Sequence, residues 1–417
     1  MATNELRVTT PSMVSSSPAE GLTVERLRTI IQDSHINFLI GAGTSAPYFE
    51  LLGDIEVALT KIGEPDEENP AAQVARASLQ GYFFEKVLLP NISLLDHAKE
   101  ARGLIKSYSR FVSMLNRILI KRRSTLLGKQ VNIFTTNVDI AFEVALELLE
   151  IDMNDGFSGK LHPRLDLGEY GTLRIRQGTR FEYRSEIPVI NLFKVHGSAS
   201  WKQEGDEIYF DHHLEQLREA KRAYRAASQE LISIADKKDI DAGQLCAKAS
   251  DMKLSAEGEK FTLAYNKLSI VNPDKTKFAT TVLNETYYEL IRRLANELEK
   301  ENSTLLVHGF SFRDEHLRSL VLRSARTNPT LQVIVFCYSR EARDDMRNLV
   351  VDEQIKNGNI LFVAPNETKD GESERNITID ILVDDYFAPL LNQNSSAADH
   401  VLELKFSSSP EDTVDDG

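Results

Sequence analysis

Short hydrophobic runs alternate along this chain with segments in which hydrophobic residues recur every three or four positions. Runs that are apolar on both faces are typical of strands in a parallel sheet covered by helices on both sides. Spacing of three and four is typical of amphipathic helices. The alternation predicts an α/β fold with a Rossmann-like parallel sheet flanked by helices. The predicted strands are residues 36–40, 131–135, 188–193, 305–308, 332–337 and 360–363.

Helical spacing predicts long helices over residues 70–89, 96–123, 315–326 and 340–354. Their apolar stripes are expected to pack against the sheet. A shorter helix is expected after Thr23, since threonine commonly caps helix N-termini.

Residues 205–265 interrupt the α/β alternation. A heptad-like seam predicts a helical hairpin inserted into the sheet domain, and the seam either packs in its own subunit or forms an oligomer contact. The seam residues are Leu217, Ala220, Tyr224, Ala227, Leu231 and Ile234.

The two ends of the chain differ in composition from the rest. Residues 1–21 are rich in Ser, Thr and Pro and predict a flexible arm, and residues 394–417 are Ser-rich and acidic and predict a disordered tail. Residues 22–393 are then expected to form one catalytic domain that includes the insertion.

Composition narrows the class of protein. A length of 417 residues fits two domains or one domain with an insertion, and a net charge of −14 argues against a chain that mainly grips nucleic acid. Cys246 and Cys337 are too few and too far apart for a disulfide framework or a four-cysteine zinc site. No long apolar run or signal peptide is visible, so we expect a cytoplasmic protein without a membrane segment.

The first predicted strand runs into a glycine turn. Such a turn lets the backbone approach a ligand, and a helix is expected to continue through residues 49–52. Backbone N–H groups and a helix N-terminus would then face a phosphate, so the N–H groups of residues 43–45 are expected to hold a pyrophosphate. The turn consists of Gly41, Ala42, Gly43, Thr44 and Ser45.

Three later strands also end in polar or glycine-containing segments. Ligands of open α/β sheets bind at the carboxyl ends of strands, so these residues are functional candidates. Asn137 or Asp139 alternatively caps the next helix, and His196 is alternatively a structural histidine. The three segments are Thr135, Thr136, Asn137 and Asp139; His196 and Gly197; and Gly309, Phe310 and Ser311.

Together and in this order, the four segments resemble the sirtuin family. In sirtuins a GAG-x-S turn, a T-x-N-x-D strand end and a catalytic His-Gly line one NAD pocket, and a Gly-Ser-type turn holds the adenosine end. The form at residues 309–317 looks like the divergent bacterial branch, whose members deplete NAD in antiphage defence. The resemblance covers roughly residues 25–365 and implies NAD+ as the substrate.

Two departures from the family bear on the activity. The four-cysteine zinc module of the protein deacetylases is absent, so no structural zinc or other metal site is expected. The family's Gly-Ile-Pro-Asp-Phe-Arg segment is replaced by residues 46–50. Both differences weaken deacylation as the activity and leave an NAD-cleaving core.

The resemblance assigns roles that suit the residue types. Asn137 is expected to orient water or the carboxamide, and Asp139 to bind ribose hydroxyls or order its loop. His196 is expected to act as the base. The binding residues implied are those of the glycine turn, Thr136, Asn137, Asp139 and the segment 309–311.

Other functions remain as alternatives. A Rossmann dehydrogenase needs an acidic strand end about 20 residues beyond the glycines, where residues 55–62 instead indicate a helix. A P-loop NTPase needs a motif that is missing. An NAD-dependent protein deacylase and a non-enzymatic nucleotide-binding scaffold remain open.

The resemblance also implies partners. Related defence proteins without a sensor domain accompany a HerA-type ATPase. We therefore expect a homo-oligomer that joins a hexameric HerA-like ATPase and meets nucleic acid only through that partner.

Overall fold

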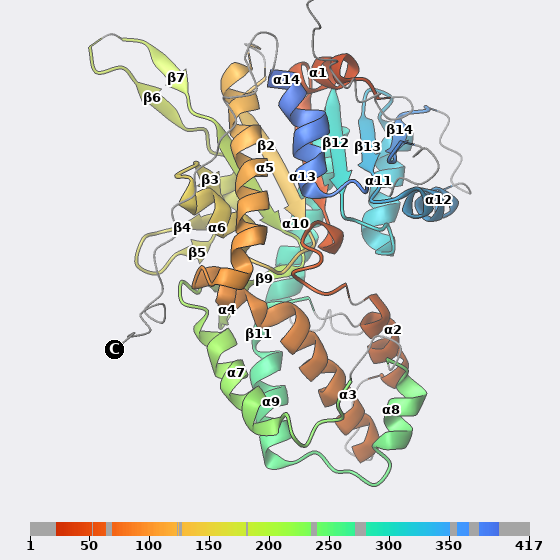
Figure 1. Cartoon of the computed structure of the whole chain (residues 1–417). Helices are drawn as coiled ribbons and strands as arrows, with labels where there is room; N and C mark the ends of the chain where they lie inside the picture. Colours follow the sequence, from red (N-terminus) through yellow and green to blue (C-terminus); the bar gives the residue numbers. More distant parts are fainter. Residues whose placement is uncertain are drawn as a thin grey trace, which may run out of the picture.

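A sheet domain and a helical lobe make up the computed structural model (Figure 1). The predicted arm, residues 1–21, and the predicted tail, residues 394–417, lie outside the described residues. The structure describes residues 22–51, 53–63, 69–122, 124, 127–180, 182–234, 240–271, 281–350, 357–366 and 375–391.

A seven-stranded, fully parallel sheet forms the centre of the sheet domain. Its order, β14-β13-β12-β1-β2-β8-β3, corresponds over six strands to the Rossmann order and confirms the predicted α/β fold. All six predicted strands are present, and β3 was not predicted. The strands are β1 (His35–Ile40), β2 (Gln130–Thr135), β3 (Met153–Asn154), β8 (Val189–Lys194), β12 (Ser303–His308), β13 (Gln332–Phe336) and β14 (Ile360–Val363).

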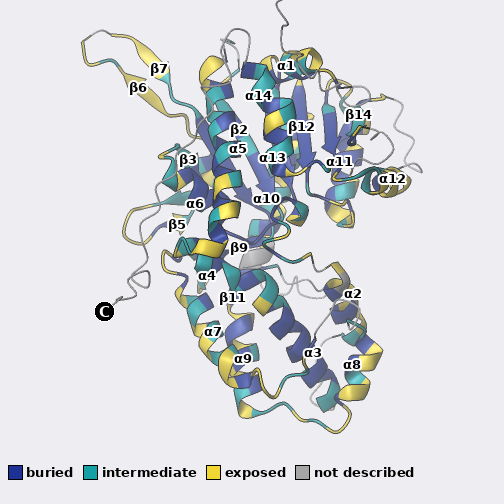
Figure 2. Ribbon diagram, in the orientation of Figure 1, coloured by how far each residue is buried: buried dark blue, intermediate teal, exposed yellow. Residues whose placement is uncertain are grey.

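The central strand β1 is buried on both faces, which explains its continuous hydrophobic sequence. Its neighbour β12 is likewise buried along its whole length (Figure 2). Phe38 points to one face, where its ring lies 5.3 Å from that of Phe111 and 6.0 Å from that of Phe387. Leu39 points to the other face and joins a separate hydrophobic cluster with Phe134 and Val307.

Helices from both ends of the described chain cover the Phe38 face. Thr23 caps the first of them by accepting from Arg26 N–H at 3.1 Å, as predicted. Phe387 comes from a C-terminal helical segment, residues 379–391, that was not predicted. The elements are α1 (Val24–Gln32), α4 (Pro90–Leu95), α5 (Arg102–Lys121), α6 (Ala141–Leu148), α13 (Ile379–Ile381), a π-helical turn (Leu382–Phe387) and α14 (Ala388–Leu391).

The Leu39 face is covered by α10 (Thr281–Glu299) and α11 (Glu315–Thr327), which pack against each other. Next to β14 lies α12 (Arg340–Asn348), which ends before the predicted end at residue 354. Residues 349 and 350 form a turn, and residues 351–354 lie outside the described residues. No helix within the described ranges combines the length and the apolar character that crossing a bilayer requires.

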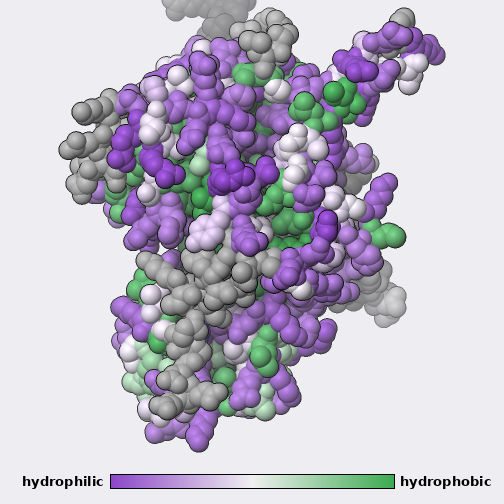
Figure 3. Space-filling model, turned by 180° about the vertical axis from the view of Figure 1, so that it is seen from behind, coloured by the Kyte–Doolittle hydropathy of each residue, from purple (hydrophilic) through white to green (hydrophobic). Residues whose placement is uncertain are grey.

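An antiparallel sheet of order β11-β9-β10-β5-β4 continues from the end of β8. A separate hairpin, β6 (Ile175–Gln177) with β7 (Arg184–Glu186), projects from the body and exposes nearly all its residues (Figures 1 and 3). The strands of the antiparallel sheet are β4 (Phe157–Ser158), β5 (Arg164–Leu165), β9 (Gly197–Glu204), β10 (Glu207–Phe210) and β11 (Leu268–Ile270).

The helical lobe combines two separate parts of the chain. The predicted insertion, residues 205–265, begins with β10 and then supplies three helices rather than a simple hairpin. These pack against two helices that follow β1, around a small core that contains Leu59, Leu79 and Leu245. The helices are α2 (Gly53–Ile62), α3 (Pro70–Phe83), α7 (Glu215–Ala227), α8 (Ala242–Lys248) and α9 (Ala256–Asn266).

The predicted seam of the insertion packs inside its own chain. Leu217 is fully buried, and the ring of Tyr224 lies 5.4 Å from Phe84 and 5.3 Å from Phe261. Because α7 already ends at Ala227, the seam is not one continuous helix. The possibility that the seam forms an oligomer contact is therefore not supported.

The backbone segments that follow β1 and β12 contact each other closely at the carboxyl end of the sheet, and we call this contact the crossing. Gly43 N–H donates to Gly309 O at 2.9 Å, and a Cβ on Gly41 would lie only 2.5 Å from that same oxygen. Gly309 has a φ of +66°, and a Cβ there would lie 2.3 Å from both N and Oγ1 of Thr44. Glycine is needed here for backbone-to-backbone contact between β1 and β12.

We predict that Gly309→Ala lowers the free energy of unfolding by about 2–4 kcal/mol, because it adds a steric overlap to a left-handed backbone. Urea denaturation measures this loss. The matched control is Gly205→Ala, which has a φ of +59° and no atom within 4 Å of its Cβ position. Equal losses in the two variants would contradict the crossing as the cause.

Candidate functional site

The four predicted segments lie together at the carboxyl end of the central sheet, because they follow neighbouring parallel strands. In the register of these strands, Ile40 pairs with Thr135 and with His308, and Thr135 pairs with Lys194. The pairing continues past the strand end, since Thr136 N–H donates to Ile40 O at 3.1 Å. This is the part of an open α/β sheet where ligands bind.

Ser45, Asn137 and Asp139 form a hydrogen-bonded cluster. Asn137 Nδ2 donates to Ser45 Oγ at 3.1 Å, and Ser45 Oγ donates to Asp139 Oδ2 at 2.9 Å. The hydroxyl of Tyr108, on α5, lies 2.6 Å from Ser45 Oγ. Since Ser45 gives its hydrogen to Asp139, Tyr108 is the donor in this third bond. Burial, together with Asp139, raises the pKa of Tyr108 well above its ordinary value and keeps it a donor.

The amide oxygen of Asn137 is buried and has no hydrogen-bond partner among the described residues. Its side chain is 5% exposed. A buried acceptor without a partner costs about 1–3 kcal/mol, so it persists where water or a ligand supplies the missing donor. Asn137 is thus the member of the cluster that has spare capacity to bind a donor group.

Asp139 also orders the start of α6. Its Oδ1 accepts from Ala141 N–H at 3.1 Å, and the neighbouring Ile140 N–H donates to Asn91 Oδ1 at 3.0 Å. The N-cap of α6 is Ile140, so Asp139 supports the helix start from the preceding residue and uses its second oxygen for Ser45. Asn137 makes no such contact with the helix among its described hydrogen bonds.

Lys194, at the end of β8, supports the Asn137 loop from the neighbouring strand. Its ammonium donates to the backbone carbonyl of Asn137 at 3.5 Å and to that of Asp139, and it pairs with Glu143 at 3.2 Å. Burial raises the pKa of Glu143 to about 7, although Lys194 acts in the opposite direction.

The hydroxyl of Thr44 is used for a hydrogen bond to His308 inside the sheet domain. His308 Nε2 lies 3.2 Å from the carbonyl oxygen of Ile377, which can only accept, so this nitrogen carries the hydrogen. Burial lowers the pKa of His308 to about 4, and its ring is therefore neutral. Its Nδ1 then accepts from the Thr44 hydroxyl at 2.8 Å.

The glycine turn differs from the predicted phosphate loop. Its helical part is a single 3₁₀ turn (Ala42–Thr44), a turn and a bend follow over residues 45–49, and α2 begins at Gly53. The predicted helix is therefore wrong over residues 49–51, and residue 52 lies outside the described residues. The N–H groups of Gly43, Thr44 and Ser45 all donate to backbone carbonyls. The prediction that they hold a pyrophosphate therefore does not fit this arrangement. Ala42 is exposed, and its N–H makes no hydrogen bond with the described residues.

His196 lies at the same end of the sheet but faces α10 and α11 rather than α5. Its Nε2 is 3.3 Å from Asp314 Oδ2, and its ring centre is 5.9 Å from that of Tyr287. Its own carbonyl accepts from Val271 N–H at 2.8 Å. No hydrogen bond joins the side chains of His196 and Asn137 within the described residues.

The following Gly197 has a φ of +77°, and a Cβ there would lie 2.2 Å from Ser269 O. Glycine is therefore required beside His196 for the close approach of β9 and β11.

In the segment after β12, Phe310 and Phe312 are buried core residues whose ring centres lie 5.1 Å apart. Ser311 between them is exposed and available to a ligand. The side chain of Arg313 reaches α2, with Nη1 3.3 Å from the Cβ position of Gly53. Of the three predicted adenosine-site residues, Ser311 is thus the one with a free side chain.

Four residues of this region were not predicted as site residues: Tyr108, Glu143, Lys194 and Asp314. Tyr108 fits the apolar stripe of its helix, and nothing in the local sequence indicates that its hydroxyl forms a hydrogen bond at the site. Asp314 directly precedes a predicted helix, a position that indicates a cap and not a histidine partner.

The two cysteines do not meet. Cys246 is partly buried against the core of the helical lobe, and Cys337 is buried just after β13. Among the described residues, no group of three or more His, Cys, Asp or Glu side chains is arranged to hold a metal ion.

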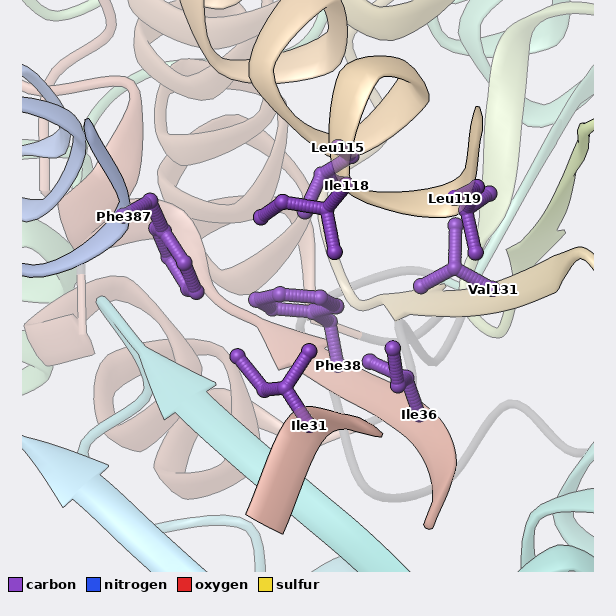
Figure 4. Close-up of a pocket in the computed structure, with 8 residues that line it drawn as sticks. All are labelled: Ile31, Ile36, Phe38, Leu115, Ile118, Leu119, Val131 and Phe387. Carbon is purple, nitrogen blue, oxygen red and sulfur yellow. The ribbon is translucent and has the colours of Figure 1, made fainter. Parts of the chain in front are cut away.

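A cavity of about 10 Å³ lies away from these residues, under α5 (Figure 4). Its walls are hydrocarbon only, with side chains such as Ile36, Phe38 and Leu119. A space of this size holds one water molecule at most, and an apolar one stays dry. It is a packing gap and not a ligand site.

In comparisons with known proteins, no family model matches this chain and no curated protein matches it.

We predict that the Glu143–Lys194 pair makes stability depend on pH. With a pKa raised from 4.5 to about 7, folded Glu143 holds a proton that the unfolded chain has released, so stability falls as pH rises through this window. Relative to Glu143→Gln, the wild type should lose about 1–3 kcal/mol between pH 4.5 and 7. Urea denaturation at several pH values across this range measures the difference in the free energy of unfolding between the two proteins. Protonation of His308 contributes equally to both and therefore cancels. A constant difference would contradict the raised pKa.

Proposed function

We propose that this chain is an NAD+ hydrolase that cleaves NAD+ to nicotinamide and ADP-ribose. The wider proposal is a cytoplasmic, sirtuin-like effector that depletes NAD in antiphage defence. The support comes from the motifs that resemble sirtuins and from a Rossmann-like sheet that carries them at its ligand-binding end.

One observation carries the proposal. Ser45 and Asn137, which belong to two motifs 92 residues apart, are joined by a side-chain hydrogen bond, and Asn137 keeps an unpaired buried oxygen. Buried acceptors are usually paired, with protein or with water. The carboxamide of nicotinamide, or a water bound in its place, has the donor that this oxygen lacks.

The proposed reaction is a substitution at the anomeric carbon. The bond between C1′ and the nicotinamide nitrogen breaks, and its electron pair leaves with nicotinamide. The oxygen of water forms the new bond to C1′, and the proton it loses passes to His196. Since the leaving group is neutral, positioning and electrostatics supply most of the catalysis.

Phosphate binding needs donors other than the N–H groups that the turn uses internally. We propose the N–H of the exposed residue Ala42 and the guanidinium of Arg313, which reaches the start of α2 from the segment after β12. Arginine suits a pyrophosphate because it presents paired donors in a planar fork. Ser311 is proposed to contact the adenosine end.

The test is to incubate the purified chain with NAD+ and to measure nicotinamide and ADP-ribose, with an acetyl-lysine peptide in parallel. We predict that Asn137→Ala abolishes cleavage. His196→Ala should lower kcat by about 100- to 10,000-fold with little change in KM, because it removes the base. Tyr209→Phe, at a half-buried position of β10, serves as the control and should retain full activity.

Three results would count against the proposal. Cleavage by Asn137→Ala at the wild-type rate would exclude that residue from the site. Deacylation of the peptide without net hydrolysis would favour the protein deacylase, and NAD+ binding without turnover would favour a nucleotide-binding scaffold.

We also propose that the chain forms a homo-oligomer and joins a hexameric HerA-like ATPase, as the resemblance implies. Since the seam of α7 packs inside its own chain, another surface must form the contact between subunits. The β6–β7 hairpin is the best candidate, because Leu173, Ile175 and Tyr183 on it are 56–62% exposed. In Figure 3, hydrophobic side chains lie near the base of this hairpin.

We predict that Ile175→Glu combined with Tyr183→Glu lowers the assembly mass measured by light scattering at micromolar concentration, without changing the circular dichroism spectrum. The control is Leu263→Glu on α9, which is 65% exposed. A monomeric wild type would refute the homo-oligomer, and equal effects of both sets would refute the hairpin as its surface.

A further inference from the structure

The contact between His196 and Asp314 joins loops that are far apart in the sequence. Asp314 Oδ2 lies 3.3 Å from His196 Nε2, and both side chains are about one-fifth exposed. The other oxygen, Oδ1, accepts from His316 N–H at 3.0 Å and from Leu317 N–H at 3.1 Å. The carboxylate is thus fixed by the N-terminus of α11 and offers its second oxygen to the histidine.

The loop before Asp314 is itself well anchored. Phe312 is buried and holds a left-handed backbone with a φ of 58°. Its carbonyl accepts from Arg318 Nη1 at 2.7 Å, which ties the loop back to α11. A non-glycine residue keeps this conformation only where its surroundings determine it, so the position of Asp314 is well defined.

The chemistry of the two groups then determines which nitrogen carries the hydrogen. A carboxylate can only accept, so Nε2 of His196 must be the donor in this contact. In the neutral imidazole the basic nitrogen is then Nδ1.

We propose that Asp314 is a positioning residue that holds His196 as the Nε2–H tautomer and makes Nδ1 the nitrogen that takes a proton. The catalytic consequence rests on the proposed NAD+ cleavage, whereas the tautomer does not. Asp314 itself suits the task, because bonding to His196 and to two N–H groups outweighs burial and lowers its pKa.

The decisive variant is Asp314→Asn, which exchanges donor and acceptor in the hydrogen bond to His196 while keeping the shape of the side chain. Asparagine caps helices as well as aspartate does. Because the cap requires an oxygen toward residues 316 and 317, the amide nitrogen must face His196. That nitrogen donates, so Nε2 would have to accept and the hydrogen would move to Nδ1.

Nitrogen NMR of the histidine rings in the full-length protein reads the tautomer directly, and loss of one signal in His196→Gln identifies the residue. We expect Nε2–H in the wild type and Nδ1–H in Asp314→Asn. Asp241→Asn, at the cap of α8, is the matched control and should leave the spectrum of His196 unchanged. The same tautomer in wild type and Asp314→Asn would overturn the proposal.

Kinetics provide the second readout. Asp314→Asn should lower kcat for NAD+ cleavage by about 10- to 1,000-fold with KM nearly unchanged, and should add no further loss to His196→Ala. Additive losses would overturn the positioning role. A wild type without NAD+ cleavage would refute the proposed function, while the NMR result would still decide the tautomer.

Discussion

The close contact between the backbones of Gly41, Gly43 and Gly309 is the constraint on which the rest of this structure depends. It fixes the ends of β1 and β12 against each other. Ser45 follows the end of β1 and Asp314 follows the end of β12, so this contact helps to determine where both polar side chains lie. In Rossmann-like sheets the switch between these two strands usually opens a crevice for a ligand. Here glycine backbones and Thr44 fill its base, and a ligand would lie further out, toward Ala42 and Ser311.

The polar groups around this crossing divide between the two faces of the sheet. Ser45, Asn137 and Tyr108 contact one another beneath α5, whereas His196 and Asp314 meet beside α10. Lys194 joins the halves physically, because it ends the strand that leads to His196 while its ammonium supports the Asn137 loop. Buried charges and amides of this kind cost stability, and such costs are commonly found at functional sites.

Much of the fold and part of the site could be predicted from the sequence, for identifiable physical reasons. Strands such as β1 are buried on both faces and therefore show as hydrophobic runs, and the rule for strand ends indicated the edge of the sheet at which Asn137 and Ser45 meet. The role of Gly41 could not be predicted, since the same residue suits a ligand contact and a backbone crossing. Tyr108 was hidden in an amphipathic stripe. The partner of His196 was missed because a helix-cap aspartate looks alike whether or not its second oxygen is used.

The return of the C-terminal segment onto β1 has a consequence for synthesis on the ribosome. Phe38 is made long before Phe387, whose ring covers it, and the residues of β12 follow their β1 partners by 268 positions, as in the pair of His35 and Ser303. Contacts at such separation form late, and the apolar face under α5 stays incomplete until Phe387 has been made. Nascent chains should thus depend on chaperones that shield this face, and a chain cut short before residue 379 would expose a lasting aggregation surface.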